Sequence, residues 1–334
     1  MAQLDFIDKI FCALPIRAFE VISIINPILP YYHMVSDDDV LHVKHLYPYK
    51  NMKKFISDLE FLQKKYRPIS VKELIEHVKR GRKLDKGSFL LSFDDGYSQM
   101  HSTVAPILYE KGIPALFFVN PGFVDNRALS HDCKTSLLAE ESRKDPQKIS
   151  KVLRGLNLVS NSSDQELTTR ILSINYRDRK LLDRIADAVD LSFDEYLATN
   201  KPYMSSSEIR EMIDLGFCFG GHSFDHPRYS ELEIDVQLSQ TLGSLDYLKR
   251  EFSLDYSVFA FPYTDKFLKR GFFDRIMNRV DITFGTSGIL EDSISFNLQR
   301  INFEKSLRPA KCILARSLLK KRVLKWKKRL TIAR

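Results

Sequence analysis

The run from Phe89 to Tyr97 constrains the fold of this chain most. Residues Phe89 to Phe93 are largely apolar, as expected of a short strand that is buried on both faces of a parallel sheet. Asp94 and Asp95 follow at once, and Gly96 permits a sharp turn of the backbone. The pattern therefore predicts two carboxylates at the end of a core strand, where parallel-sheet enzymes hold their catalytic groups. Asp-Asp-Gly is also typical of a plain turn before a helix cap, so other residues must decide.

A second motif, Gly220 to Pro227, contains two histidines, His222 and His226, and follows the short apolar stretch Phe217–Phe219. Two imidazoles separated by three residues can converge on one metal ion. Zinc takes imidazole nitrogens at about 2.0–2.1 Å, and a catalytic zinc site has three protein ligands, so one Asp of the first motif would complete the set. A hydrogen-bonded loop is the alternative interpretation of the same pair. A third strand that ends at a turn is predicted at Val258–Tyr263.

Taken in order, these motifs resemble those of the polysaccharide deacetylase family, the NodB-like carbohydrate esterases. The order runs from Asp94-Asp95-Gly96-Tyr97 through His222-Ser223-x-x-His226 to Phe261-Pro262-Tyr263. The resemblance includes Leu29–Val35, which is similar to the first strand of many members, and it covers residues 29–125 and 202–303. An ordered match of this kind is specific. It implies the fold of the family, a distorted (β/α) barrel.

The resemblance also implies a role for each matching residue. Asp95, His222 and His226 would bind a divalent metal, usually zinc in this family, and Asp94 would be the general base. A metal polarises the amide carbonyl, while a carboxylate beside it takes the proton of the attacking water. Neighbouring side chains on an extended chain point in opposite directions, so the two acids can take separate roles only if the turn rotates one of them inward. The backbone N–H of Tyr263 would stabilise the developing oxyanion.

Two departures from the family pattern bear on activity. Many members have an Arg two residues before the motif proline, which holds the catalytic Asp, and this sequence has Ala260 there. The late His that supplies the general acid is also missing, because no His follows His226. One candidate for the acid is His33, at the end of the first predicted strand, and a buried structural histidine is the alternative. The other candidate is Arg300, which could orient Asp94 or stabilise charge without donating a proton.

Strand and helix patterns alternate through most of the 334 residues, which predicts an α/β fold. The resemblance implies a barrel of about seven strands over residues 28–304. A helical insertion is predicted at 126–201, either covering one side of the mouth and shaping substrate choice or serving as a passive buttress. His131 and Asp132 lie in this insertion and are not assigned to the site. Strands are expected at 28–32, 68–71, 88–93, 115–119, 217–220, 258–260, 282–285 and 294–298.

Positive charge is concentrated in a C-terminal tail, residues 305–334. The tail holds twelve Lys and Arg residues and no acid, more than the net charge of +8 of the whole chain. Leu314, Leu318 and Trp326 intersperse with these cations as in a basic amphipathic helix, which predicts peripheral contact with an anionic membrane. A solvated helix packed on the barrel is the alternative. Nucleic-acid binding is not expected, because Trp326 is the only aromatic residue of the tail and no known binding module is visible.

Residues 1–27 are predicted to form an N-terminal helical segment with Phe6, Ile10 and Leu14 on its apolar face. The segment does not have the pattern of a secretion signal, because acidic residues precede its first basic residue. Four cysteines show no paired spacing, which indicates a reducing compartment. The predicted location is therefore cytoplasmic, at the inner membrane surface if the basic tail binds lipid.

Three functions are consistent with these residues. The favoured one is metal-dependent hydrolysis of an N-acetyl group on a sugar or glycan, with Zn²⁺ as the expected metal and Asp94 as the base. The alternative is a catalytically altered or inactive glycan-binding protein of the same fold, as Ala260 and the missing late His suggest. The third is a glycosidase that uses Asp94 and Asp95, but adjacent residues are poorly suited to the separation of roughly 5–10 Å that such pairs need. The sequence names neither the sugar nor the oligomeric state.

Overall fold

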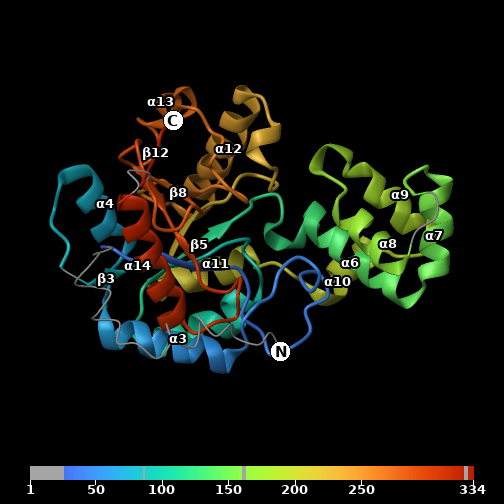
Figure 1. Ribbon diagram of the computed structural model, residues 1–334, viewed down its shortest axis with the longest axis horizontal. Coiled ribbons are helices and arrows are strands. Elements are labelled where there is room, and N and C mark those ends of the chain that lie inside the picture. The colour runs from blue at the N-terminus through green and yellow to red at the C-terminus, as the bar shows by residue number, and fades with distance from the viewer. Residues whose placement is uncertain (1–25, 86, 160–162, 327–329) are drawn as a thin grey trace.

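The computed structural model describes residues 26–334, except for 86, 160–162 and 327–329. The predicted helical segment 1–27 therefore lies almost entirely outside the described residues. The described chain folds into a barrel with a lobe of helices beside it (Figure 1). No helix of the described residues is long and apolar enough to cross a membrane.

A parallel sheet forms the centre of the barrel, and each of its strands pairs in parallel with its neighbours. The order of the strands across the sheet is β10-β8-β7-β6-β5-β4-β1-β11. β5 is the clearest case of a strand buried on both faces, since all five of its residues are buried. The strands are β1 (Pro30–Tyr32), β4 (Leu91–Phe93), β5 (Ala115–Val119), β6 (Cys218–Gly221), β7 (Val258–Ala260), β8 (Ile282–Gly285), β10 (Asn297–Gln299) and β11 (Ile301–Asn302).

The two ends of this sheet are consecutive pieces of one extended segment. β10 and β11 stand at opposite ends of the strand order, yet only Arg300 separates them in the sequence. The N–H of Arg300 donates to the carbonyl of Gly285 (3.0 Å), and the N–H of Ile301 donates to the carbonyl of Leu29 (2.8 Å). One segment thus pairs with β8 on one side and with β1 on the other. This closes a distorted barrel of seven strands, which confirms the predicted fold class.

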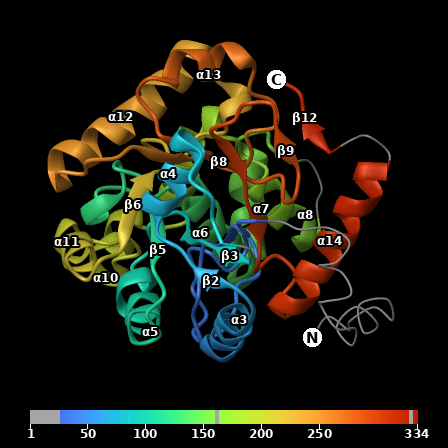
Figure 2. The same cartoon turned by 90° about the vertical axis from the view of Figure 1, so that its left-hand side faces the viewer.

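Helices surround the sheet (Figure 2), and the first of them in the described chain buries an apolar face. This helix, α3, buries Phe55, Leu59 and Leu62, and the side chain of Asn51 caps its N-terminus. A π-helical turn, Met100–Val104, leads into α5. The helices around the barrel are α3 (Met52–Lys65), α4 (Val71–Arg80), α5 (Ala105–Glu110), α11 (Ser206–Asp214), α12 (Ile234–Phe252), α13 (Arg270–Ile276) and α14 (Ala310–Trp326).

Two predicted strands are wrong for most of their length, since β10 includes only the last two residues of the predicted strand 294–298. Of residues 68–71, only Pro68 is in a strand, β2 (Arg67–Pro68), which pairs with β3 (Ser88–Phe89) in a separate two-stranded sheet. Ser70 instead starts a helix, because its side chain and that of Glu73 form a capping box. Reciprocal capping of this kind satisfies two of the N–H groups that a helix start leaves unpaired.

The described residues of the segment predicted as an insertion form five α-helices beside the barrel (Figure 1). They share an apolar core, to which Leu138, Leu153, Ile171 and Ile185 contribute, and this core continues into Tyr203 beside the barrel. The lobe is therefore packed against the barrel and not tethered by a free linker. Its helices are α6 (His131–Lys144), α7 (Pro146–Gly155), α8 (Asp164–Leu172), α9 (Lys180–Ala188) and α10 (Phe193–Asn200).

The basic tail contains α14, whose first half is docked on the barrel. Ile313 and Leu314 are buried in the barrel core, and the N–H of Ala310 donates to the buried carboxylate of Asp58 (2.7 Å). Cys312 on the same helix is disulfide-bonded, a state that the cysteine spacing did not predict.

The far end of α14 has a different environment from its docked first half. Val323 is 50% exposed and Trp326 is 82% exposed. Beyond the helix, β12 (Thr331–Ile332) pairs with β9 (Glu291–Asp292), and Arg334 bonds to Asp265 and Asp292. The chain therefore returns to the barrel after leaving an apolar and basic helix end in solvent.

Candidate active site

Asp94 and Asp95 point in different directions because the backbone changes conformation between them. The N–H of Asp94 donates to the carbonyl of Tyr32 (3.0 Å) and so continues the ladder of β4. Asp95 then adopts a left-handed conformation with φ of 72°, and Gly96 follows with φ of 69°. A positive φ is uncommon for a residue with a side chain and indicates a functional constraint. This turn rotates the side chain of Asp95 away from that of Asp94, so the two acids can take separate roles.

Arg300 holds Asp94 through a bidentate ion pair. Its two terminal nitrogens lie 2.6 and 2.8 Å from the two carboxylate oxygens of Asp94, and both side chains are buried. Burial alone would raise the pKa of Asp94, but Arg300 and His222 outweigh it and hold this pKa below its usual value. Asp94 is therefore an ionised carboxylate. Many family members hold the catalytic Asp with an arginine at the position of Ala260. Arg300 holds Asp94 here instead, which is one of the two roles expected for it from the sequence.

Asp95, His222 and His226 converge on one point. Oδ1 of Asp95 lies 3.4 Å from Nε2 of His222 and 3.3 Å from Nε2 of His226. The three ligand atoms lie within 4.8 Å of one another. The same Oδ1 is buried and has no hydrogen-bond partner among the described residues. A carboxylate oxygen and two imidazole nitrogens are donors that zinc accepts, so these residues fit the predicted metal.

The other ring nitrogen of each histidine is also engaged. Nδ1 of His222 donates to the carbonyl of Ala260 (2.8 Å), and Nδ1 of His226 lies 3.1 Å from Oδ2 of Asp132. These partners leave both Nε2 atoms facing Asp95. Burial lowers the pKa of His226, but Asp95 and Asp132 outweigh it and raise this pKa to about 10. The carboxylates thus favour a positive charge at this point, which a divalent cation would supply in place of the proton.

His33 lies on the rim of the same cavity and is paired with an acid that the sequence analysis missed. Its Nδ1 contacts Oε1 of Glu304, and its backbone N–H donates to Oε2 of Glu304 (2.9 Å). Burial lowers the pKa of His33, but Glu304 outweighs it and raises this pKa to about 9. The His33 side chain is 20% exposed, so it is not a buried core histidine. It is a protonated imidazole open to the cavity at neutral pH.

Tyr263 occupies the opposite wall in a left-handed conformation, with φ of 55°. Thr286 Oγ1 donates to its carbonyl (2.9 Å), and the guanidinium of Arg228 lies 4.1 Å from its ring centre. Its hydroxyl donates to Oδ2 of Asp132 (2.5 Å). Within the described residues, no acceptor is bonded to the backbone N–H of Tyr263.

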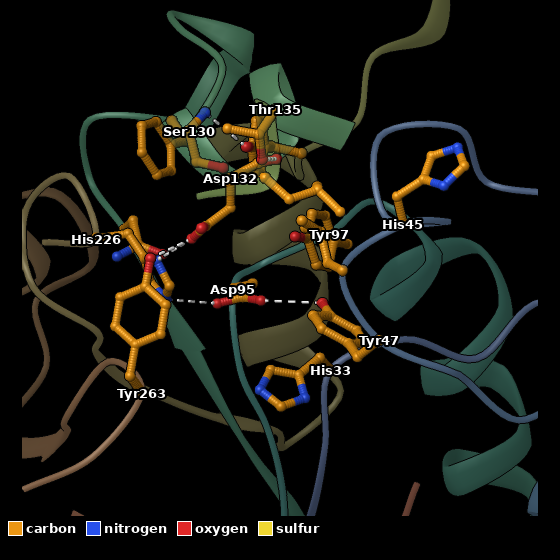
Figure 3. Close-up of a pocket in the computed structure, with 15 residues that line it drawn as sticks. His33, His45, Tyr47, Asp95, Tyr97, Ser130, Asp132, Thr135, His226 and Tyr263 are labelled. Carbon is orange, nitrogen blue, oxygen red and sulfur yellow. Dashed lines mark hydrogen bonds and ion pairs between the residues drawn. The ribbon is translucent and has the colours of Figure 1, made fainter. Parts of the chain in front are cut away.

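A cavity of about 370 Å³ is lined by part of this set (Figure 3), whereas Asp94, His222 and Arg300 are buried and are not among its lining residues. Figure 3 shows Asp132 directed at His226 and Tyr263, with Asp95 between His226 and Tyr47. The helical lobe therefore forms part of the wall. The lining residues include Asp95, His226, Tyr263 and His33 from the barrel and Ser130, Asp132, Thr135 and Leu172 from the lobe.

Three residues of the site were not predicted from the sequence: Asp132, Glu304 and Tyr47. The hydroxyl of Tyr47 donates to Oδ2 of Asp95 (3.2 Å). Asp132 was considered and left out, and the structure places it against His226. None of the three belongs to a motif. Only Glu304 had a local feature that could have indicated its role. It lies just after the last barrel strand, and acids at such strand ends face the site.

Comparison with solved structures finds folds similar to this one. The Streptococcus pyogenes deacetylase PplD in complex with acetate is 15% identical, with a TM-score of 0.55, covering 88% of this chain and 99% of its own. IcaB from Ammonifex degensii is 16% identical with a TM-score of 0.54, covering 86% and 96%. A de-N-acetylase from Aggregatibacter actinomycetemcomitans is 15% identical with a TM-score of 0.51, covering 82% and 93%. At these identities the likeness concerns the fold.

No curated protein sequence matches the chain. The family model described as polysaccharide deacetylase matches residues 81–271, which is more than half of the chain and includes both the Asp and the His motifs. His33 and Arg300 lie outside the matched range. The match and the geometry together identify the chain as a member of the polysaccharide deacetylase family, whose enzymes hydrolyse N-acetyl amide bonds.

Proposed function

We propose that this protein removes acetyl groups from an N-acetylated sugar or glycan by divalent metal-dependent hydrolysis, with Zn²⁺ as the metal. One observation carries the proposal. The three convergent ligand atoms of Asp95, His222 and His226 lie beside an ionised carboxylate, Asp94, that an arginine holds in place. This combination supplies a cation site with a base directly beside it.

The residues of the candidate site account for the proton transfers. A divalent ion held by Asp95, His222 and His226 would polarise the amide carbonyl and make water more acidic. Asp94 takes the proton from the attacking water, since Arg300 keeps it ionised. The N–H of Tyr263 stabilises the negative charge that develops on the carbonyl oxygen.

His33 completes this sequence as the general acid. It gives its proton to the nitrogen of the departing amine, and Glu304 keeps it protonated until then. Its position on the cavity rim, with the side chain partly exposed, supports this role.

The alternative, an inactive glycan-binding protein, rested on two missing residues. Arg300 reaches Asp94 from the closing strand, and His33 reaches the cavity from β1, so each gap has an occupant of suitable chemistry. This supports an active enzyme over the binding protein. A glycosidase receives no support, because Asp94 is engaged by Arg300 and Asp95 faces the histidines.

Peripheral membrane contact through the tail is a further part of the proposal. Trp326 and Val323 are exposed at the end of α14, and Lys320 and Arg322 on the same half of the helix are also exposed. Exposed apolar side chains flanked by cations suit an anionic bilayer, where each cation contributes about 1 kcal/mol to the free energy of binding. The cytoplasmic location remains a prediction, and the bonded state of Cys312 gives no support to a reducing compartment.

The role of Asp94 predicts an inactive variant that still binds metal. Asp94→Asn should lose at least about 100-fold in acetate release from acetamido-sugars, because the base is removed while all three ligands remain. Acetate release and zinc content are the measurements. Asp38→Asn, an exposed acid outside the cavity, is the matched control and should behave like wild type. Wild-type turnover by Asp94→Asn would overturn the base assignment.

The pKa of His33 predicts an alkaline limb in the pH profile. The active form carries the proton on His33, so kcat/KM should fall as pH rises through about 9. His33→Gln should lower the rate by about 10²–10⁴-fold and remove this limb, because glutamine neither titrates nor donates a labile proton. The profile is measured with wild type and variant on one acetamido-sugar. A full rate with an unchanged limb in His33→Gln would exclude His33 as the acid.

The exposed end of α14 predicts binding to anionic vesicles. The full chain should sediment with phosphatidylglycerol vesicles and remain in solution with phosphatidylcholine vesicles. The combined variant Lys320→Glu, Arg322→Glu and Trp326→Ala should remain in solution with both, because charge and apolar contact are lost. Equal recovery of wild type and variant from anionic vesicles would reject membrane contact.

A further inference from the structure

The two proposed histidine ligands are oriented by partners of different kinds. Nδ1 of His222 bonds to a backbone carbonyl, that of Ala260 on β7, whereas Nδ1 of His226 contacts a carboxylate, that of Asp132. The partner at the second nitrogen fixes the tautomer of a ligand histidine, and a carboxylate there also makes the ligand nitrogen more basic. His226 adopts a left-handed backbone with φ of 61°, on a loop after β6. Its ring therefore depends on side-chain partners for its orientation.

Asp132 belongs to the helical lobe and not to the barrel. It lies in the first turn of α6, two residues after the capping residue Ser130, whose Oγ accepts from the N–H of Cys133 (3.1 Å). The N–H of Ser130 donates to the hydroxyl of Tyr203 (3.1 Å). The start of α6, and with it Asp132, is thus fixed by a residue that follows the lobe in sequence.

The base of the lobe is closed at the same place. The side-chain amide of Asn126 donates to the carbonyl of Tyr203 (3.0 Å), and its oxygen accepts from the N–H of Tyr203 (2.9 Å). Asn126 and Tyr203 flank the lobe on either side in sequence. These two residues therefore join its two connections to the barrel, and the hydroxyl of Tyr203 extends this junction to the helix that carries Asp132.

A single carboxylate oxygen links the lobe to His226 and Tyr263, whose neighbouring rings have centroids 4.8 Å apart. Oδ2 of Asp132 accepts from the hydroxyl of Tyr263 (2.5 Å) and also lies against Nδ1 of His226. Oδ1 of Asp132 lies 3.4 Å from Nε2 of His131. With its side chain only 24% exposed, Asp132 is shielded from water, which strengthens both hydrogen bonds.

We propose that Asp132 is a positioning residue that sets the affinity of the Asp95, His222 and His226 site for a divalent metal. The helical lobe is then a structural part of the metal site, and not only a wall of the cavity. This inference rests on the proposed function for the existence of the metal site. It goes further because it assigns a role at the metal site to the lobe, which carries none of the family motifs.

The test is the zinc affinity of the purified protein, measured by competition with a chromophoric chelator. Asp132→Ala should bind zinc about 10–100-fold more weakly than wild type, because the His226 ring loses its partner. Asp132→Asn should lie between the two, since the amide oxygen can still accept from Nδ1. The matched control is Asp183→Asn on α9 of the same lobe, whose half-exposed carboxylate bonds to Lys134, and it should bind zinc as wild type does.

The outcomes separate this inference from the proposed function. Wild-type zinc affinity in both Asp132 variants would overturn the inference and leave the metal site standing. A wild type that binds no zinc would overturn the metal site and this inference together. Thermal unfolding of the metal-free proteins shows whether Asp132→Ala folds normally. If it does not, the nearly isosteric Asp132→Asn decides, and a wild-type affinity there would overturn the inference.

Discussion

The ion pair between Arg300 and Asp94 connects the closing segment of the barrel to the candidate site. Arg300 is the one residue between β10 and β11, so it stands where the sheet closes. A buried carboxylate needs a charged partner, and loss of one partner from a buried pair leaves an uncompensated charge. The segment that closes the barrel therefore also supplies the cation that keeps Asp94 ionised. Ring contacts at 4.5 Å to Tyr31 and 5.1 Å to Phe118 hold the guanidinium in place.

The strand ends and their motifs could be predicted because they are local. Apolar residues that end at Asp94 and Asp95 fix a core strand and its carboxyl end. The Gly-rich stretch before His222 reflects close packing, since a Cβ at Gly220 would lie 2.6 Å from the ring of Phe118. Sequence patterns report such features directly. The same reasoning failed at residues 68–71, where the helix cap at Ser70 prevailed over a short β-like pattern.

The partners of the site residues could not be predicted because they come from distant parts of the chain. Glu304 reaches His33, and Asp132 reaches His226, through the closure of the barrel and the docking of the lobe. Neither residue has a spacing or a neighbour that indicates its partner. From the sequence, Arg300 could be named only as one of two candidates to replace the missing late His, with the orientation of Asp94 as one of its possible roles. Residues that act on a site through other residues leave little trace in a single sequence.

The measurement that tests the account most directly is the metal content of the purified protein beside His226→Ala. It requires no knowledge of the sugar. We expect about one zinc, or a similar divalent ion, per wild-type chain and little in the variant, because three protein ligands hold the ion and the variant lacks one of them. No bound metal in the wild type, even after reconstitution with zinc, would contradict the account and would favour a glycan-binding protein that keeps the deacetylase fold without its chemistry.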